Sequence, residues 1–155
     1  MNILLKIDDF QENIIFLESK KNNIMNGNFI KMLYSTEYFT MNGIFIDFPI
    51  VNFEKKVYNG KKILFFNTSE NIDLISRISK IESTIIELFI KNECPQNKSL
   101  FNKKMVNTIH TQMINGMVKY YNYTNENDSN HFYIKISGIW ETDLDIGLTY
   151  KIIQY

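Results

Sequence analysis

Four Asn-Gly pairs divide this chain into short segments and favour β-hairpins. They lie at positions 26–27, 42–43, 59–60 and 115–116. Asn and Gly both accept the positive φ angles of a type I′ turn, which most side chains resist. The runs "NFIKMLYS", "IFIDFPI" and "KKILFFN" are rich in β-branched and aromatic residues and have the length of strands. The sequence therefore predicts many hairpins, with Pro49 near a strand end or edge.

One segment, residues 67–93, has the period of a helix instead. Its apolar side chains recur at spacings of three and four, which places them on one helix face. They are Ile72, Ile75, Ile78, Ile81, Ile85, Leu88 and Phe89. The charged residues Lys80, Glu82 and Glu87 are expected to lie off this face. We expect a helix of about five or six turns, whose apolar face packs against a sheet.

The boundaries of this helix and the segment after it are less sharply marked. Asn67 followed by Glu70 resembles a capping box, and Pro95 predicts the end of the helix. In the next stretch, "SLFNKKMVNTIHTQM", four apolar residues fit a helix stripe. They are Phe101, Met105, Ile109 and Met113. A strand entering the turn at 115–116 fits equally, and we favour a strand from about Thr108.

The order of elements is several strands, one long helix and a final group of strands, which defines a mostly β, α+β fold. Five-stranded OB barrels place a helix between their third and fourth strands. The order is therefore compatible with an OB-like five-stranded barrel that carries an N-terminal β extension, although other α+β arrangements also fit. With 155 residues and 45% hydrophobic content, we expect residues 1–155 to form a single domain.

Charge and composition limit the classes of partner. Lys plus Arg and Asp plus Glu both number 17, so the formal net charge is zero. Any site for a polyanion must therefore be a local patch. The chain has no Ala and a single Arg, which indicates A- and T-rich codons, so Lys and aromatic content alone carries little weight. A single Cys, no signal-type N-terminus and no apolar run of about 18 residues favour a reducing intracellular compartment.

Three strand-like runs near the C-terminus each place Lys on the face away from the expected core. Side chains alternate between the two faces of a strand, so "MVKYYNY", "HFYIKIS" and "LTYKIIQ" can each be split into two sets. The polar sets supply the candidate nucleic-acid-binding residues, which are Lys119, Tyr121, Tyr123, Tyr133, Lys135 and Lys151. A Tyr ring stacks on a base of any identity while Lys meets the phosphate. Alternatively, these residues are the ordinary exposed face of a chain with this codon bias.

Catalytic and metal sites are not expected. Asp143 and Asp145, near Glu141, could bind a divalent cation, but an acidic hairpin break more often only keeps a loop solvated. The two His residues lack zinc-ligand spacing to Cys94. Because no glycine-rich phosphate loop is present either, we expect no cofactor, no metal and no enzymatic activity.

The stretch "IKISGIWETDLDIGLTYKI", preceded by "INGMVKYYNY" and by the expected helix, resembles a known group. It is similar to the single-stranded-DNA-binding proteins of large DNA viruses, an OB-fold group likened to those of tailed phages. The resemblance runs from about residue 71 to 155. It is strongest at Gly138, Trp140, Glu141, Gly147, Leu148, Thr149, Tyr150 and Lys151.

In that family the barrel holds DNA on aromatic and basic side chains. The resemblance maps this role to Lys119, Tyr121, Tyr133, Lys135 and Lys151. The phage proteins typically end in a flexible acidic tail that binds partners, whereas this sequence ends in "YKIIQY". That departure puts recruitment through a tail in doubt.

The only Trp, Trp140, would under this resemblance either plug the mouth of the barrel or present a stacking surface. We favour the plug, because Ile134, Ile136 and Leu148 nearby look like core and a buried indole contributes much apolar area.

Two functions from different classes follow from these patterns. The first is a sequence-tolerant single-stranded-DNA-binding protein of viral DNA replication or recombination, a homo-oligomer at a replication site in the host cytoplasm or nucleus. RNA is an open alternative to DNA, because no residue can be assigned to a 2′-hydroxyl contact. The second is a virion structural or scaffold protein that self-assembles through its sheet edges without binding nucleic acid. Zero net charge favours the second, whereas the Tyr and Lys faces and the resemblance favour the first.

Overall fold

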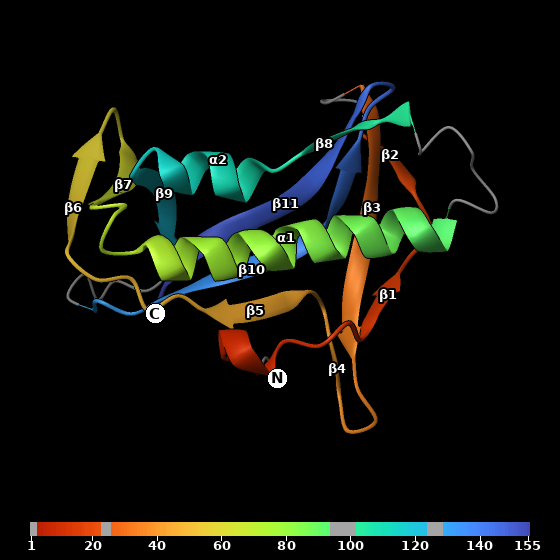
Figure 1. Ribbon diagram of the computed structural model, residues 1–155, viewed down its shortest axis with the longest axis horizontal. Coiled ribbons are helices and arrows are strands. Elements are labelled where there is room, and N and C mark those ends of the chain that lie inside the picture. The colour runs from red at the N-terminus through yellow and green to blue at the C-terminus, as the bar shows by residue number, and fades with distance from the viewer. Residues whose placement is uncertain (1–2, 23–25, 94–101, 124–128) are drawn as a thin grey trace.

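A mixed sheet of eleven strands carries two helices on one of its faces in the computed structural model, which describes residues 3–22, 26–93, 102–123 and 129–155 (Figure 1). The helices are α1 (Ile72–Glu93) and α2 (Thr108–Ile114), and a 3-10 turn covers Ile7–Asp9. The strands are β1 (Ile14–Phe16), β2 (Lys20–Asn22), β3 (Gly27–Ser35), β4 (Thr40–Met41), β5 (Ile44–Asp47), β6 (Phe53–Tyr58), β7 (Lys61–Phe66), β8 (Lys104–Val106), β9 (Met117–Asn122), β10 (Phe132–Glu141) and β11 (Asp145–Gln154). The mostly β, α+β class is confirmed.

The sheet is open. Its strands follow the order β1-β3-β10-β11-β9-β7-β6, with β2 and β4 paired to β3, β5 to β10, and β8 to β11. Closure into a barrel requires the two ends of such a path to pair, but in the described residues β1 pairs only with β3 and β6 only with β7. The expected closed five-stranded barrel is therefore wrong.

The hairpin of β10 and β11 was predicted by its alternating sequence, and the structure places it at the centre of the sheet. The antiparallel register runs from Phe132 opposite Gln154 to Glu141 opposite Ile146, with a bulge between Ile136 and Gly138. At this bulge β10 changes its other partner from β5 to β3. Ile136 and Ile139 on either side of the bulge are both fully buried. The extra residue therefore keeps both ends of β10 in one core.

Within the described residues, one Asn-Gly pair forms a two-residue hairpin turn. Asn59 and Gly60 have φ angles of 49° and 73°, and Tyr58 pairs with Lys61 across the turn. The pair at 26–27 belongs to the β2–β3 hairpin, whose turn lies partly outside the described residues. The hairpin prediction is wrong at 42–43, because β4 and β5 pair with different strands, and at 115–116, where the pair links α2 to β9.

Helix α1 confirms most of the predicted stripe, including Phe89 near its end, and corrects it at two residues. Ile75, Ile78 and Ile85 are buried against the sheet, as expected. Leu88 is only half-buried, and Ile72 at the first helical position is exposed. The predicted end of the helix at Pro95 lies outside the described residues.

The start of α1 depends on Asn71 and not on the predicted capping box. The side-chain oxygen Oδ1 of Asn67 accepts a hydrogen bond from the backbone N–H of Ser69, two residues along, and Glu70 pairs with another loop residue. The side chain of Asn71, which directly precedes the helix, accepts from Val51 N–H and donates to Val51 C=O, at 3.0 and 2.9 Å. Asn71 thereby fixes the start of α1 to the loop after β5.

The prediction of a strand from Thr108 is wrong, because residues 108–114 form α2 and bury Ile109 and Met113.

The sequence also placed Glu82 off the buried face of α1, yet its side chain is fully buried. Its two carboxylate oxygens accept hydrogen bonds from the backbone N–H groups of Ile109 and His110, at 2.9 and 3.0 Å. A carboxylate from α1 thus satisfies the free N–H groups at the start of α2, and that long-range contact left no local pattern in the sequence.

Candidate nucleic-acid interface

The sheet face opposite the helices, here called the open face, carries all six residues that the sequence singled out. The strand order β10-β11-β9 confirms that the three Lys-bearing strands are neighbours. Lys119 and Lys151 are exposed, and Tyr121, Tyr133 and Lys135 are half-buried. The sixth residue, which directly follows β9, is Tyr123, and 68% of its surface is exposed. Because α1 and α2 both lie on the other side of β10 and β11 (Figure 1), neither helix covers the open face.

Three lysines lie side by side on these neighbouring strands and form what we call the lysine row: Lys119, Lys135 and Lys151. Lys135 and Lys151 are direct partners in the β10–β11 register. Lys119 and Lys151 both place Nζ over the ring of Tyr121, at 4.7 and 4.9 Å from its centre. Adjacent strands are about 4.8 Å apart, so the row is a compact site of positive charge on a chain with no net charge.

Aromatic rings lie next to the lysine row on β5, on β10 and directly after β11. The ring of Tyr133 lies 5.8 Å from that of Phe45 and 5.5 Å from that of Tyr155. Lys135 Nζ lies 5.4 Å from the centre of the Phe45 ring. Tyr155 is exposed and is a candidate that the sequence did not suggest, whereas Phe45 is buried and supports Lys135 and Tyr133 from below. Phe45 reaches the open face because β5 pairs with β10, which places it opposite Lys135. The sequence predicted a strand at "IFID", but it did not show which strand would be its partner.

Two tyrosines at the edge of the lysine row, Tyr133 and Tyr155, hold their hydroxyl protons more tightly than a free tyrosine does. Burial raises the pKa of the Tyr133 hydroxyl, and the nearby Tyr123 raises it further. Burial and the carboxylate of Asp47 likewise raise the pKa of Tyr155. A neutral ring does not repel phosphate, so both side chains suit stacking beside a nucleic-acid backbone.

A groove opens next to the lysine row where the sheet has a gap. β8 pairs with residues 145–147 of β11 and β9 pairs with residues 152–154, so between these segments α2 lies beside β11 in place of a strand. The groove has a volume of about 330 Å³. Lys119, Tyr121 and Lys151 line its open side, and Gln112 and Tyr150, whose hydroxyl donates to the Gln112 carbonyl oxygen, line the other.

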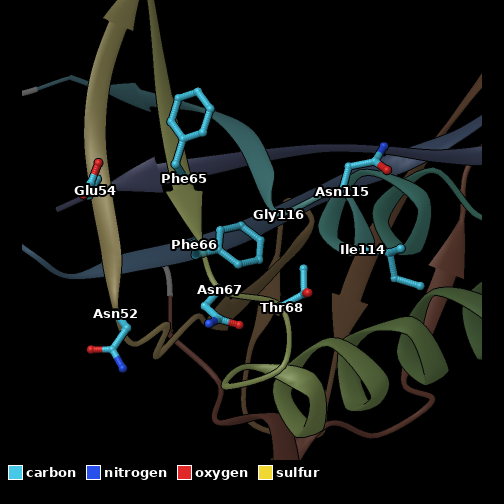
Figure 2. A pocket seen from close by; sticks show the side chains of 9 residues that line it. All are labelled: Asn52, Glu54, Phe65, Phe66, Asn67, Thr68, Ile114, Asn115 and Gly116. Atoms are coloured by element: carbon cyan, nitrogen blue, oxygen red, sulfur yellow. The ribbon is translucent and has the colours of Figure 1, made fainter.

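A second pocket, of about 470 Å³, lies between the β6–β7 hairpin and the C-terminal end of α2. Figure 2 shows Phe66 and Thr68 facing Ile114 and Asn115 across it. Its only charged lining residue is Glu54. A single carboxylate disfavours a phosphate ligand, so this pocket is not part of the candidate interface.

The acidic residues of the β10–β11 turn do not form a cation site. Glu141 is buried and accepts hydrogen bonds from Lys103 Nζ and Asn28 Nδ2, at 3.0 and 3.1 Å, whereas Asp143 is exposed. The part of the chain that the structure describes holds no group of three or more His, Cys, Asp or Glu side chains that could bind a metal. It also has no helix long and apolar enough to cross a membrane. Cys94 lies outside the described residues.

Trp140 lies on the open face and not in the core. It shares this face with Gly147, its partner in β11, and its side chain is half-buried. The indole Nε1–H donates to the carbonyl oxygen of Leu148 at 3.2 Å. Because the sheet is open, there is no barrel mouth for the indole to plug, and the plug expected from the sequence is not found.

Comparisons with known proteins identify no relative. No family model matches the chain, and neither the curated proteins nor the solved structures give a match.

Proposed function

We propose that this protein binds single-stranded DNA without sequence preference through its open face, as a non-enzymatic component of viral DNA replication or recombination. The observation that carries the proposal is the lysine row flanked by Tyr121 and Tyr133 on adjacent strands. Lysines bind phosphates whatever the base, and a tyrosine ring stacks on any base. Together they form a surface suited to an unpaired strand.

The energies of the contacts agree with this role. A cation–π contact at an exposed site contributes ~0.5–1 kcal/mol, whereas stacking of a base on an aromatic ring contributes ~1–3 kcal/mol. An incoming base can therefore displace the ammonium groups of Lys119 and Lys151 from the ring of Tyr121. The displaced ammonium groups are then free to meet the phosphates on either side of that base.

The finer parts of the proposal depend on the resemblance. They are an OB-like relationship to the single-stranded-DNA-binding proteins of large DNA viruses, a homo-oligomeric state and a replication site in the host cytoplasm or nucleus. Supporting them are the "SGIWETDLDIGLTYKI" stretch and the long helix between two groups of strands. The open sheet counts against a standard OB barrel.

A fluorescence-anisotropy titration of labelled oligo-dT at several salt concentrations tests the proposal. If each lysine of the row meets one phosphate, log K falls against log salt with a slope near −0.7 per contact, about −2 for the row. The double variant Lys135→Ala/Lys151→Ala should reduce the magnitude of that slope by about 1.4. The matched control replaces Lys80 and Lys91, which are exposed on α1, and should leave the slope unchanged. Equal binding by parent and double variant at low salt would reject the proposal.

Self-assembly through sheet edges is the second candidate, and one observation favours it. β6 ends the strand path, and its residues Val57 and Tyr58 are 71% and 67% exposed. An exposed apolar edge strand is a template for pairing with another chain. Under this alternative, Val57→Lys should abolish concentration-dependent assembly in light scattering while the Lys135→Ala/Lys151→Ala variant assembles normally.

A further inference from the structure

The open face continues beyond the lysine row onto β3 and β2. Trp140 in β10 pairs with Phe29 in β3, and Phe29 pairs in turn with Lys20 in β2. Lys31 in β3 pairs with Gly138. Because partners on adjacent strands point to the same face, this end of the sheet brings two aromatic rings and two lysines together, beside the three lysines at the other end.

Two glycines allow these rings to lie against the backbone. A Cβ atom at Gly147 would lie 2.6 Å from the indole Cζ2 of Trp140, and one at Gly138 would lie 2.8 Å from Cζ of Phe29. Such distances are too short for a side chain, so each ring occupies space that only glycine leaves free. The hydrogen bond from the indole to Leu148 fixes the orientation of Trp140. Both rings are thus held in place on the open face, and both are half-buried.

The surface between the two ends of the open face carries only small side chains. The register places Lys135 opposite Lys151, Gly138 opposite Thr149 and Trp140 opposite Gly147. From Lys151 to Gly147 is four residues, or roughly 13 Å along the strand. Over this distance Ser137 and Thr149 are half-buried, and Gly138 is buried against the Phe29 ring. No large side chain of β10 or β11 separates the lysine row from the indole.

We propose that Trp140 and Phe29 form a second stacking platform for the same single strand, and that Lys31 and Lys20 meet its phosphates there. This inference rests on the proposed function and extends its interface from three strands to five. The ligand is an unpaired run of nucleotides, because only exposed bases can stack on the rings. It also assigns the only Trp of the chain to the ligand and not to the core.

Intrinsic fluorescence tests the platform directly, because Trp140 is the only Trp. The probe is an oligo-dT of about 12 nucleotides, within the range of site sizes known for such proteins. Saturation with this strand should quench the emission and protect the indole from acrylamide. Trp140→Ala should weaken binding by about 5- to 150-fold and leave the salt slope unchanged, whereas Trp140→Phe should retain most of the affinity.

Lys31→Ala should reduce the magnitude of the salt slope by about 0.7. Its matched control is Lys21→Ala, because Lys21 pairs with Asn28 and so points to the opposite side of the sheet from Lys20. The control should change nothing.

The outcomes separate this inference from the proposed function. Salt-dependent binding that is weakened by Lys135→Ala/Lys151→Ala, with unchanged Trp140 emission and unchanged affinity in Trp140→Ala, would overturn the platform and leave the function standing. Failure of the parent protein to bind oligo-dT would overturn both. If Trp140→Ala does not fold, the change in Trp140 emission of the parent protein and the salt slope of Lys31→Ala still test the platform.

Discussion

The two faces of the β10–β11 hairpin are built from alternate residues of the same strands, yet they differ in every property that matters for function. On the helix side, Ile134, Ile136 and Ile139 are fully buried beneath α1 and α2. On the open face, Tyr133 and Lys135 are half-buried and no helix covers them. The same codon bias applies to both faces. The separation of Ile from Lys and Tyr therefore reflects the fold and not the composition.

The exposed side of α1 provides a second contrast. There, charges of both signs alternate, and Arg77 lies 3.8 Å from Asp73 one turn away. The lysine row makes no ion pair with any described residue, and its lysines lie over aromatic rings instead. An ordinary solvated surface of this chain therefore looks like α1. The open face differs from that pattern because its charged residues here are all positive and because aromatic rings lie beside them.

The largest expected effect is on the covered face. Ile85→Ala should lower the free energy of unfolding by ~2–5 kcal/mol, because it removes a fully buried aliphatic side chain and leaves a cavity. Urea denaturation measures the change. Leu88→Ala is the matched control on the same helix, and its effect should be smaller because Leu88 is half-buried. An equal loss in both variants would contradict the assigned orientation of α1.

A smaller effect concerns the carboxylate that joins the helices. Glu82→Gln keeps one acceptor oxygen for two backbone N–H groups, so one N–H is left unsatisfied at a cost of ~1–3 kcal/mol. Burial raises the pKa of Glu82 above its ordinary value of 4.5, so the folded state binds this proton more tightly than the unfolded state. The unfolding free energy of the parent should therefore fall as the pH rises from about 4.5 through the raised pKa. That component should be missing from the denaturation curves of Glu82→Gln.

On the open face we expect the smallest effects on stability and separable effects on binding. Lys151→Ala should change the unfolding free energy by less than about 0.5 kcal/mol and reduce the magnitude of the salt slope for oligo-dT by about 0.7. Tyr121→Ala should lower affinity by ~1–3 kcal/mol with the slope unchanged. Calorimetric titration with oligo-dT at three salt concentrations distinguishes loss of a phosphate contact from loss of a stacking contact. If both variants altered the slope alike, Tyr121 would act by placing the lysines and not by stacking.

The sequence predicted those elements whose signal is local and strong. The alternation in "HFYIKIS" and the three-four spacing around Ile78 correctly indicated β10 and α1, because each pattern follows directly from burial of one face. The Lys and Tyr sets of β9, β10 and β11 were correct for the same reason. The three strands are neighbours because of two pairings. The predicted hairpin gave the pairing of β10 with β11, but the pairing of β11 with β9 joins distant segments and was not predicted.

The errors all arise from contacts between distant segments. Helix α2 is a single short element whose first N–H groups bond to Glu82 of α1, so its strand-like residues gave the wrong assignment. The turn at 42–43 looked like a hairpin, but β5 has its partner in β10, far along the chain. Trp140 was expected in the core because its neighbours in sequence are core residues. The bulge that places it on the other face had one local sign, Gly138 inside the strand pattern, which was not interpreted as a bulge.

That bulge sets the phase of the whole surface. With strict alternation after Ile136, Trp140 would point inward and Ile139 outward, since a shift of one residue exchanges the faces of a strand. The one extra residue near Ser137 brings Trp140 and Lys135 onto the same side of the sheet. A single-codon deletion at this position, with every aromatic and basic residue retained, would put the two halves of the surface out of phase. The open face therefore depends on the number of residues in β10 as well as on their identity.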